Sequence, residues 1–178
     1  NNLARSFYKH ACTMAEYSGF ILPISQYDNT DSLYLFDLIE SIDLGILEYS
    51  EMNVHCCFNL YKRPQNGKFG KKVNWDNGLL KIYRDDLPNY MQITDYDFCL
   101  TRRGDLGKVR TKNIESSSFK IKVTDKNRID EVIKTITAFK WHEYKKHQSA
   151  PCMSKNDVWR LFNPNQFKEL KERGLFNF

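Results

Sequence analysis

The chain has 178 residues, of which 41% are hydrophobic, and a formal net charge of +5 at pH 7. This composition excludes a disordered chain, and no apolar run approaches the ~20 residues that a membrane-spanning helix needs. We expect one globular domain over residues 1–178. The sequence begins at Asn1 without a Met, which is typical of a piece of a longer protein.

The first third of the sequence predicts two helices separated by a short strand. Apolar residues recur at helical spacing over residues 2–17, and residues 20–24 form a short apolar run. Thr30 or Asp31 can cap a second helix that ends at about residue 43. The apolar stripe of the first helix consists of Leu3, Phe7, Ala11 and Met14.

Between residues 46 and 123 the sequence changes to a β pattern. Runs rich in aromatic and β-branched residues are separated by turn signals such as Asn66-Gly67 and Asn77-Gly78. Consecutive strands with short turns favour an antiparallel meander. The predicted strands cover residues 52–61, 79–83, 90–100, 108–111 and 117–123.

The last part of the sequence predicts helices. An apolar stripe indicates a long helix over residues 127–147, Ser154 can cap a short helix over 155–162, and Pro164 can begin another. The predicted fold class is therefore α+β. We expect an antiparallel sheet of about five strands, with an N-terminal helical pair and C-terminal helices packed on it.

Charge is divided unevenly along the chain. Residues 1–51 contain eight acidic and two basic residues, whereas residues 52–178 contain 25 basic and 14 acidic residues. Such an asymmetry favours a polyanionic partner. Phosphate binding needs Lys and Arg along a surface that a nucleic-acid backbone can follow. Our first hypothesis is a nucleic-acid-binding domain, for DNA or RNA, that uses a basic loop and sheet surface over residues 62–128.

The candidate contacts of this hypothesis are the basic residues of three segments and one tryptophan. Trp141 lies opposite Ile136 on a helical wheel, so it would be exposed and could stack on a base, unless the C-terminal helices cover it. The alternative for the charges is that they are solvated and keep the domain soluble. The candidates are Lys62, Arg63, Lys68, Lys71, Lys72, Arg102, Arg103, Lys108, Arg110, Lys112, Lys120, Lys122 and Trp141.

A second hypothesis is a protein-interaction or assembly module. The acidic residues of the first third fall on or beside the helix predicted to end near residue 43. This acidic helix could meet the basic band of another copy, or of a longer parent polypeptide.

A third hypothesis is a metal-dependent nuclease. The hairpin and following helix that contain Asp97 and Lys120 resemble the arrangement of PD-(D/E)xK nucleases. The resemblance implies these two residues as catalytic and Mg²⁺ as cofactor, since carboxylates hold the metal while a lysine positions water. Ser118 occupies the position of the second acid and Glu115 lies out of register, so a degenerate, non-cutting relative is an alternative interpretation.

The five cysteines predict neither a disulfide framework nor a zinc site. Their number is odd and no CxxC or HxxxH spacing occurs. Cys56 and Cys57 are neighbours in a predicted strand, so their side chains would point to opposite faces. We expect buried, unreactive thiols in a reducing intracellular compartment, with no membrane partner and no cofactor outside the nuclease hypothesis.

Overall fold

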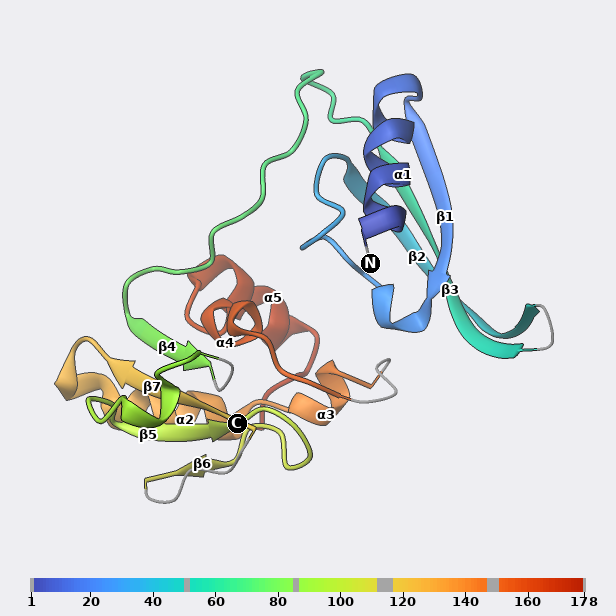
Figure 1. Ribbon diagram of the computed structural model, residues 1–178. Coiled ribbons are helices and arrows are strands. Elements are labelled where there is room, and N and C mark those ends of the chain that lie inside the picture. The colour runs from blue at the N-terminus through green and yellow to red at the C-terminus, as the bar shows by residue number, and fades with distance from the viewer. Residues whose placement is uncertain (1, 50–51, 85–86, 112–116, 147–150, 178) are drawn as a thin grey trace. The chain divides into compact units, whose positions relative to one another are not determined.

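The structure is a computed structural model in which the chain forms two compact units, unit 1 (Asn1–Asn74) and unit 2 (Trp75–Phe178). Each unit has its own antiparallel sheet and its own cluster of buried apolar side chains (Figure 1). The α+β class is confirmed, with sheets of three and four strands in place of one sheet of about five. The single domain expected from the length stays a prediction. The structure describes residues 2–49, 52–84, 87–111, 117–146 and 151–177.

Unit 1 combines one helix with a three-stranded sheet of order β1-β3-β2 (Figure 1). Its longest strands, β2 and β3, form a hairpin, and β1 pairs with the other side of β3. The elements are α1 (Asn2–Met14), β1 (Tyr17–Pro23), the 3-10 turn η1 (Ile24–Gln26), β2 (Asp37–Tyr49) and β3 (Met52–Lys62).

The predicted second helix is wrong, because residues 37–49 form strand β2. Two register shifts, between Leu38 and Glu40 and between Asp43 and Gly45, interrupt its pairing with β3. Each bulge moves the following side chains to the other face, so the sequence lacks the strict alternation that signals a strand. Hydrogen bonding along the length of β3 favours the extended conformation, although the apolar residues of this segment recur at helical spacing. Of the two helices expected in the N-terminal third, α1 is the one that forms.

The face that α1 buries also differs from the prediction. Tyr8 and Cys12 are buried, whereas Leu3, Phe7 and Met14 are each more than 60% exposed. The Tyr8 hydroxyl accepts a hydrogen bond from the backbone N–H of Phe36 at 2.8 Å. The aromatic ring thus supplies buried area while its polar end is satisfied, which orients α1 on the sheet.

Buried protonated groups of unit 1 predict sensitivity to alkaline pH. Burial raises the pKa of the Cys57 thiol from 9.0 to about 11 and that of the Tyr61 hydroxyl from 10.0 to about 12. Below pH 9 both groups are neutral in the folded and unfolded chain. As the pH rises from about 9 to 12 the unfolded chain ionises first, so the free energy of unfolding falls.

We expect unit 1 to lose stability across this alkaline window, and Tyr61→Phe to remove the upper part of the loss. Urea unfolding of the full chain at a series of pH values, followed by far-ultraviolet circular dichroism, measures the effect. A free energy of unfolding that stays constant from pH 9 to pH 12 contradicts this assignment.

Unit 2 contains a four-stranded antiparallel sheet of order β4-β7-β5-β6. Strand β4 pairs with β7 and not with β5, so a simple meander is wrong here. The elements are β4 (Leu80–Arg84), η2 (Tyr90–Gln92), β5 (Phe98–Thr101), β6 (Val109–Arg110), β7 (Ser118–Val123), η3 (Lys126–Arg128), α2 (Ile129–Ala138), α3 (Trp141–Tyr144), α4 (Lys155–Arg160) and α5 (Pro164–Glu172).

Side chains of β7 alternate between two environments. Phe119, Ile121 and Val123 belong to a buried cluster that also includes Val132 of α2 and Val158 of α4.

A reciprocal capping box between the side chains and backbones of residues 154 and 157 begins α4. The predicted 127–147 helix is shorter than expected, because the chain becomes extended at residue 139, where it forms an isolated bridge with residue 176.

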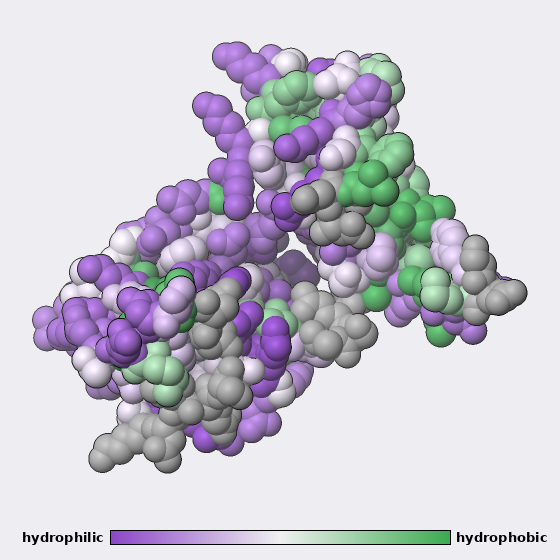
Figure 2. All heavy atoms as spheres, in the orientation of Figure 1, coloured by the Kyte–Doolittle hydropathy of each residue, from purple (hydrophilic) through white to green (hydrophobic). Residues whose placement is uncertain are grey.

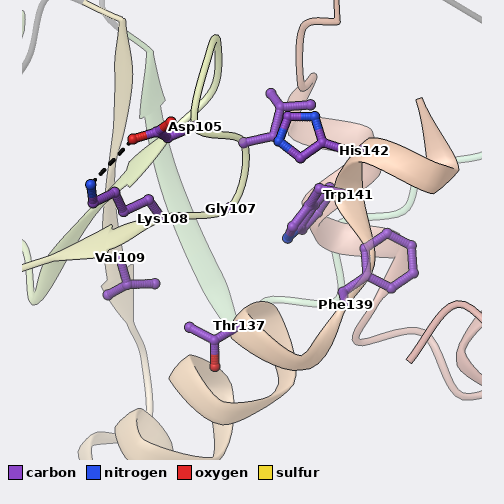
Figure 3. A pocket seen from close by; sticks show the side chains of 9 residues that line it. Asp105, Gly107, Lys108, Val109, Thr137, Phe139, Trp141 and His142 are labelled. Carbon is purple, nitrogen blue, oxygen red and sulfur yellow. Dashed lines mark hydrogen bonds and ion pairs between the residues drawn. The ribbon is translucent and has the colours of Figure 1, made fainter. Parts of the chain in front are cut away.

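Trp141 is buried, which corrects the expectation of an exposed ring. It is 3% exposed and its indole N–H donates to the Ile136 carbonyl at 2.9 Å. The backbone of Gly107 lies against the indole (Figure 3), so that a Cβ at this position would be 2.0 Å from Trp141 Cδ1. Gly107 also has φ +81°, in the region that favours glycine.

Gly107→Ala is expected to destabilise unit 2 more than Gly104→Ala. Both positions have positive φ, and the backbone cost of alanine there is about 1–2 kcal/mol. Only residue 107 adds a clash with the indole, worth a further ~1–3 kcal/mol, since nothing lies within 4 Å of the Cβ position of Gly104. Urea unfolding followed by tryptophan fluorescence reports on unit 2, which contains all three tryptophans. Equal losses for the two variants contradict the packing.

Candidate functional site

The predicted basic band is divided between the two units. Lys62, Arg63, Lys68, Lys71 and Lys72 belong to unit 1, and the other candidates belong to unit 2. Lys112 lies outside the described residues. The local environment of each cation therefore decides what it can contact.

Lys120 is the most unexpected of these residues, because it is 1% exposed. Its Nζ donates to the carbonyls of Tyr90 and Ile93 at 2.7 Å each. The ammonium also lies 4.6 Å and 5.0 Å from the ring centroids of Tyr90 and Tyr96. These contacts attach residues 87–97 to the side of the sheet opposite the apolar cluster. Lys120 therefore stabilises unit 2 through buried hydrogen bonds and is not accessible to a phosphate.

Two arginines of the band also make internal contacts. The guanidinium of Arg63 donates to the carbonyls of Cys12 and Ala15 at 2.7 Å and 3.1 Å, at the end of α1. Arg102 is 9% exposed and lies 5.2 Å from the ring centroid of Phe119. Both side chains would have to leave these contacts to reach a phosphate.

Several surface cations have carboxylate partners. Lys108 pairs with Asp105 at 3.2 Å (Figure 3), and Lys122 pairs with Asp95. The hydrogen bond from Lys122 holds the pKa of Asp95 below its usual value. Such pairs reduce the positive field that would attract a phosphate chain.

The remaining candidates have mixed environments. Lys68, Lys71, Lys72 and Arg103 are exposed, and Arg110 is half-buried. Lys62 lies 5.1 Å from the ring centroid of Tyr17, and a hydrogen bond with that tyrosine raises the pKa of the lysine. The structure thus brings together on one surface fewer cations than the hypothesis assumed, and nucleic-acid binding stays a prediction.

Asp97 and Lys120, the proposed nuclease pair, both form hydrogen bonds within unit 2. One oxygen of Asp97 accepts from the Val123 N–H at 2.7 Å, and the other accepts from Lys126 Nζ at 2.5 Å. Lys120 is engaged by two carbonyls. Among the described residues, no group of three or more His, Cys, Asp or Glu side chains could hold a metal ion. The arrangement gives a magnesium nuclease no support, and this hypothesis also stays a prediction.

One concave site occurs in unit 2, between the loop of residues 105–109 and residues 137–142 (Figure 3). Several of its polar groups have partners within the protein. Lys108 pairs with Asp105, and the Thr137 hydroxyl donates to the Ile133 carbonyl at 2.9 Å. The site is wide and shallow, so it lacks the enclosed shape of a small-molecule pocket.

The most distinctive surface is the second face of the unit 1 sheet, which we call the open face. The register places alternate residues of each strand on this face, while the intervening residues face the cluster that contains Tyr8 and Tyr61. Its apolar members, with two glycines, are Tyr17, Gly19, Ile21 and Pro23 of β1, Ile42, Gly45, Leu47 and Tyr49 of β2, and Met52, Val54, Cys56, Phe58 and Leu60 of β3.

Phe58 lies at the centre of the open face. Its cross-strand partner on β1 is Ile21, and a Cβ on its diagonal neighbour Gly19 would be 2.8 Å from Phe58 Cζ, so the ring covers the glycine backbone. The Phe58 ring fills the space that a side chain at position 19 would occupy, so the apolar surface is continuous from β3 to β1.

Much of the open face is accessible to water. Of the 15 exposed large hydrophobic residues in the described chain, only Leu87 and Met91 belong to unit 2. Figure 2 shows the corresponding concentration of apolar side chains on unit 1. The exposed members of the open face are Tyr17 (49%), Ile21 (53%), Ile42 (42%), Tyr49 (45%) and Met52 (64%).

The far end of the open face is a two-stranded arm. The pairing of β1 with β3 ends at Pro23 and Cys56, so residues 46–49 and 52–55 pair only with one another. A two-stranded hairpin is marginally stable alone in water. The arm nevertheless presents Leu47, Tyr49, Met52 and Val54 on the open face.

The edge beside this face is acidic. Strand β2 is an edge strand with Asp37, Glu40, Asp43 and Glu48, and it contains no Lys or Arg. Charges and bulges on an edge strand both hinder pairing with a strand of another chain. A partner is therefore expected to contact the face rather than the edge.

Comparison with known proteins gives no assignment: no family model, curated protein or solved structure matches this chain. No described helix is both long enough and apolar enough to cross a membrane.

The internal role of Lys120 predicts a large difference between two neighbouring lysines. Lys120→Met leaves two buried carbonyls without a donor and should cost about 2–4 kcal/mol. Lys122→Met removes an ion pair with an exposed carboxylate and should cost much less than Lys120→Met. Urea unfolding followed by tryptophan fluorescence measures both. A Lys120→Met variant as stable as the original chain would show that these hydrogen bonds do not stabilise unit 2.

Proposed function

We propose that the chain is a protein-interaction module that binds a partner protein on the open face of unit 1. The observation that supports this most strongly is the apolar sheet face that no described element of unit 1 covers. Exposed apolar patches of this size on a folded protein mark interaction sites. The alternation of open-face residues along three strands gives the patch a defined, rigid shape.

The chemistry of the open face favours a protein over other ligands. Its charged residues on β2 are the acidic Asp37 and Glu40, and carboxylates repel the phosphates of nucleic acids and of anionic lipids. Lys62 of β3 lies beside Asp37 on the same face. A nearly flat sheet face also lacks the concavity that surrounds a small molecule. Tyrosine, methionine and phenylalanine, which occur here, are enriched at protein interfaces.

This proposal retains the interaction hypothesis and changes the surface that serves it. The acidic segment is a strand, and two of its carboxylates, Asp37 and Glu40, lie on the open face at the edge of the apolar patch. In interfaces of this kind the apolar centre provides most of the affinity, whereas rim charges select the partner and its orientation.

Photo-crosslinking can test whether the open face contacts protein. A benzophenone side chain at position 42 of the full chain, on the open face, should give crosslinked protein in an extract of its source cells. The matched control is position 46, an isoleucine on the opposite face of the same strand. We expect product from position 42 only, and Ile21→Lys in the same chain should suppress it. Equal products from both positions, or none, contradict the proposed function.

A further inference from the structure

We infer that the occupant of the open face is a second copy of this chain, packed face to face around a two-fold axis. The inference rests on the proposed function and adds the identity of the partner. Three features of unit 1 support it: the dimensions of the face, the small size of its core, and the distribution of charge around it.

The dimensions of the open face fit another sheet. Strand β3 has 11 residues, so the face is about 37 Å long. It is about 14 Å wide along the seven residues of β1 and about 10 Å wide along the two-stranded arm. A stable interface buries roughly 800 Å² on each partner, which requires cover over nearly the whole face, arm included. One helix, about 10 Å across, would leave an outer strand in water. A sheet of equal length and width covers it, as in a β-sandwich.

The partner must supply an uncovered sheet face of this size, and among the sheets of the described residues the open face is the one that remains uncovered. The sheet of unit 2 buries one face in its apolar cluster, and residues 87–97 lie over the other, where Lys120 holds them. Two open faces are self-complementary in size and chemistry, which is the condition for a closed two-fold dimer.

Unit 1 has a small buried core, so it would gain stability from a partner that is always present. Its buried cluster consists of five residues, and small units commonly gain stability from oligomerisation. A transient partner would leave the apolar face in water between binding events, with a risk of aggregation. A second copy is available whenever the chain is made. The cluster consists of Tyr8, Cys12, Leu33, Phe36 and Tyr61.

The charges allow this arrangement. The charged residues of the open face are Asp37 and Glu40 of β2 and Lys62 of the central strand β3, which pairs with Asp37. A two-fold axis parallel to the strands places each β2 over the β1 of the second copy. The open-face residues of β1 are Tyr17, Gly19, Ile21 and Pro23, which are uncharged, so the acidic edges stay apart.

The sign of the salt dependence distinguishes a second copy from a basic partner. Two copies carry the same net charge of +5, so salt screens their repulsion and leaves the apolar contact intact. Their association should be unchanged or tighter at high salt. A basic partner attracted by the acids of β2 would instead bind more weakly as salt increases.

Sedimentation velocity of the purified full chain across the micromolar range tests the inference. We expect a monomer–dimer equilibrium that Ile42→Lys weakens at least about 100-fold, because an unpaired lysine would be buried in the interface. Ile46→Lys makes the same change on the opposite face of the same strand and should leave the dimerisation constant within about two-fold. Ile21→Lys is the second variant if Ile42→Lys does not fold.

The outcomes separate the inference from the proposed function. If the chain is a monomer at every concentration of protein and salt, a second copy is not the partner. The inference is also wrong if the dimer keeps its affinity in both the Ile42→Lys and the Ile21→Lys variant. A dimer weakened equally by Ile46→Lys also overturns it. A monomer that still gives a position 42 crosslink to another protein leaves the proposed function intact and refutes only the inference.

Discussion

The apolar surface of each sheet must be removed from water, and this constraint accounts for most of the structure. Unit 2 meets it within the chain. One face of its sheet shares a buried cluster with the helices, and residues 87–97 lie over the other face. Unit 1 meets it on one face only, where Tyr8 and Cys12 of α1 join the cluster beneath the sheet. The uncovered face is the reason for proposing a partner.

The two sheets also show how the same charge can serve different purposes. In unit 2 a basic residue, Lys120, is buried so that its ammonium binds two carbonyls of the covering segment. In unit 1 the acidic residues remain at the surface on β2, where they discourage strands of other chains from pairing with the edge. Neither role requires a polyanion. The net positive charge of residues 52–178 is therefore compatible with a protein whose main contact surface is apolar.

Much of the fold could be predicted from local signals. Strand β3, the strands near residues 80 and 120, the cap at Ser154 and the helix start at Pro164 lie close to where propensity and capping chemistry place them. In residues 118–123 the apolar Phe119, Ile121 and Val123 alternate with polar or basic residues, a pattern typical of a strand with two different faces. Its basic face was expected in water, because nothing in the sequence shows that a segment 30 residues earlier supplies two carbonyls to Lys120.

The open face could not be predicted, because it depends on the strand that was predicted as a helix. Ile42 and Ile46 lie four residues apart, a spacing that in a helix puts them on one stripe. In the structure the bulge near Asp43 places them on opposite faces of the sheet. Pairing with β3 decides between these outcomes, and it is a contact between distant residues that a local pattern does not contain.

The isoleucine methyl groups of unit 1 allow the most direct test of the claim that a second copy covers the open face. Attenuation of their NMR signals by a soluble paramagnetic reagent can be measured in the full chain at high and low concentration. The account predicts that Ile21 and Ile42 are shielded at high concentration and become accessible on dilution, while Ile46 is accessible throughout. Equal attenuation of all three, or shielding that dilution does not change, would contradict it.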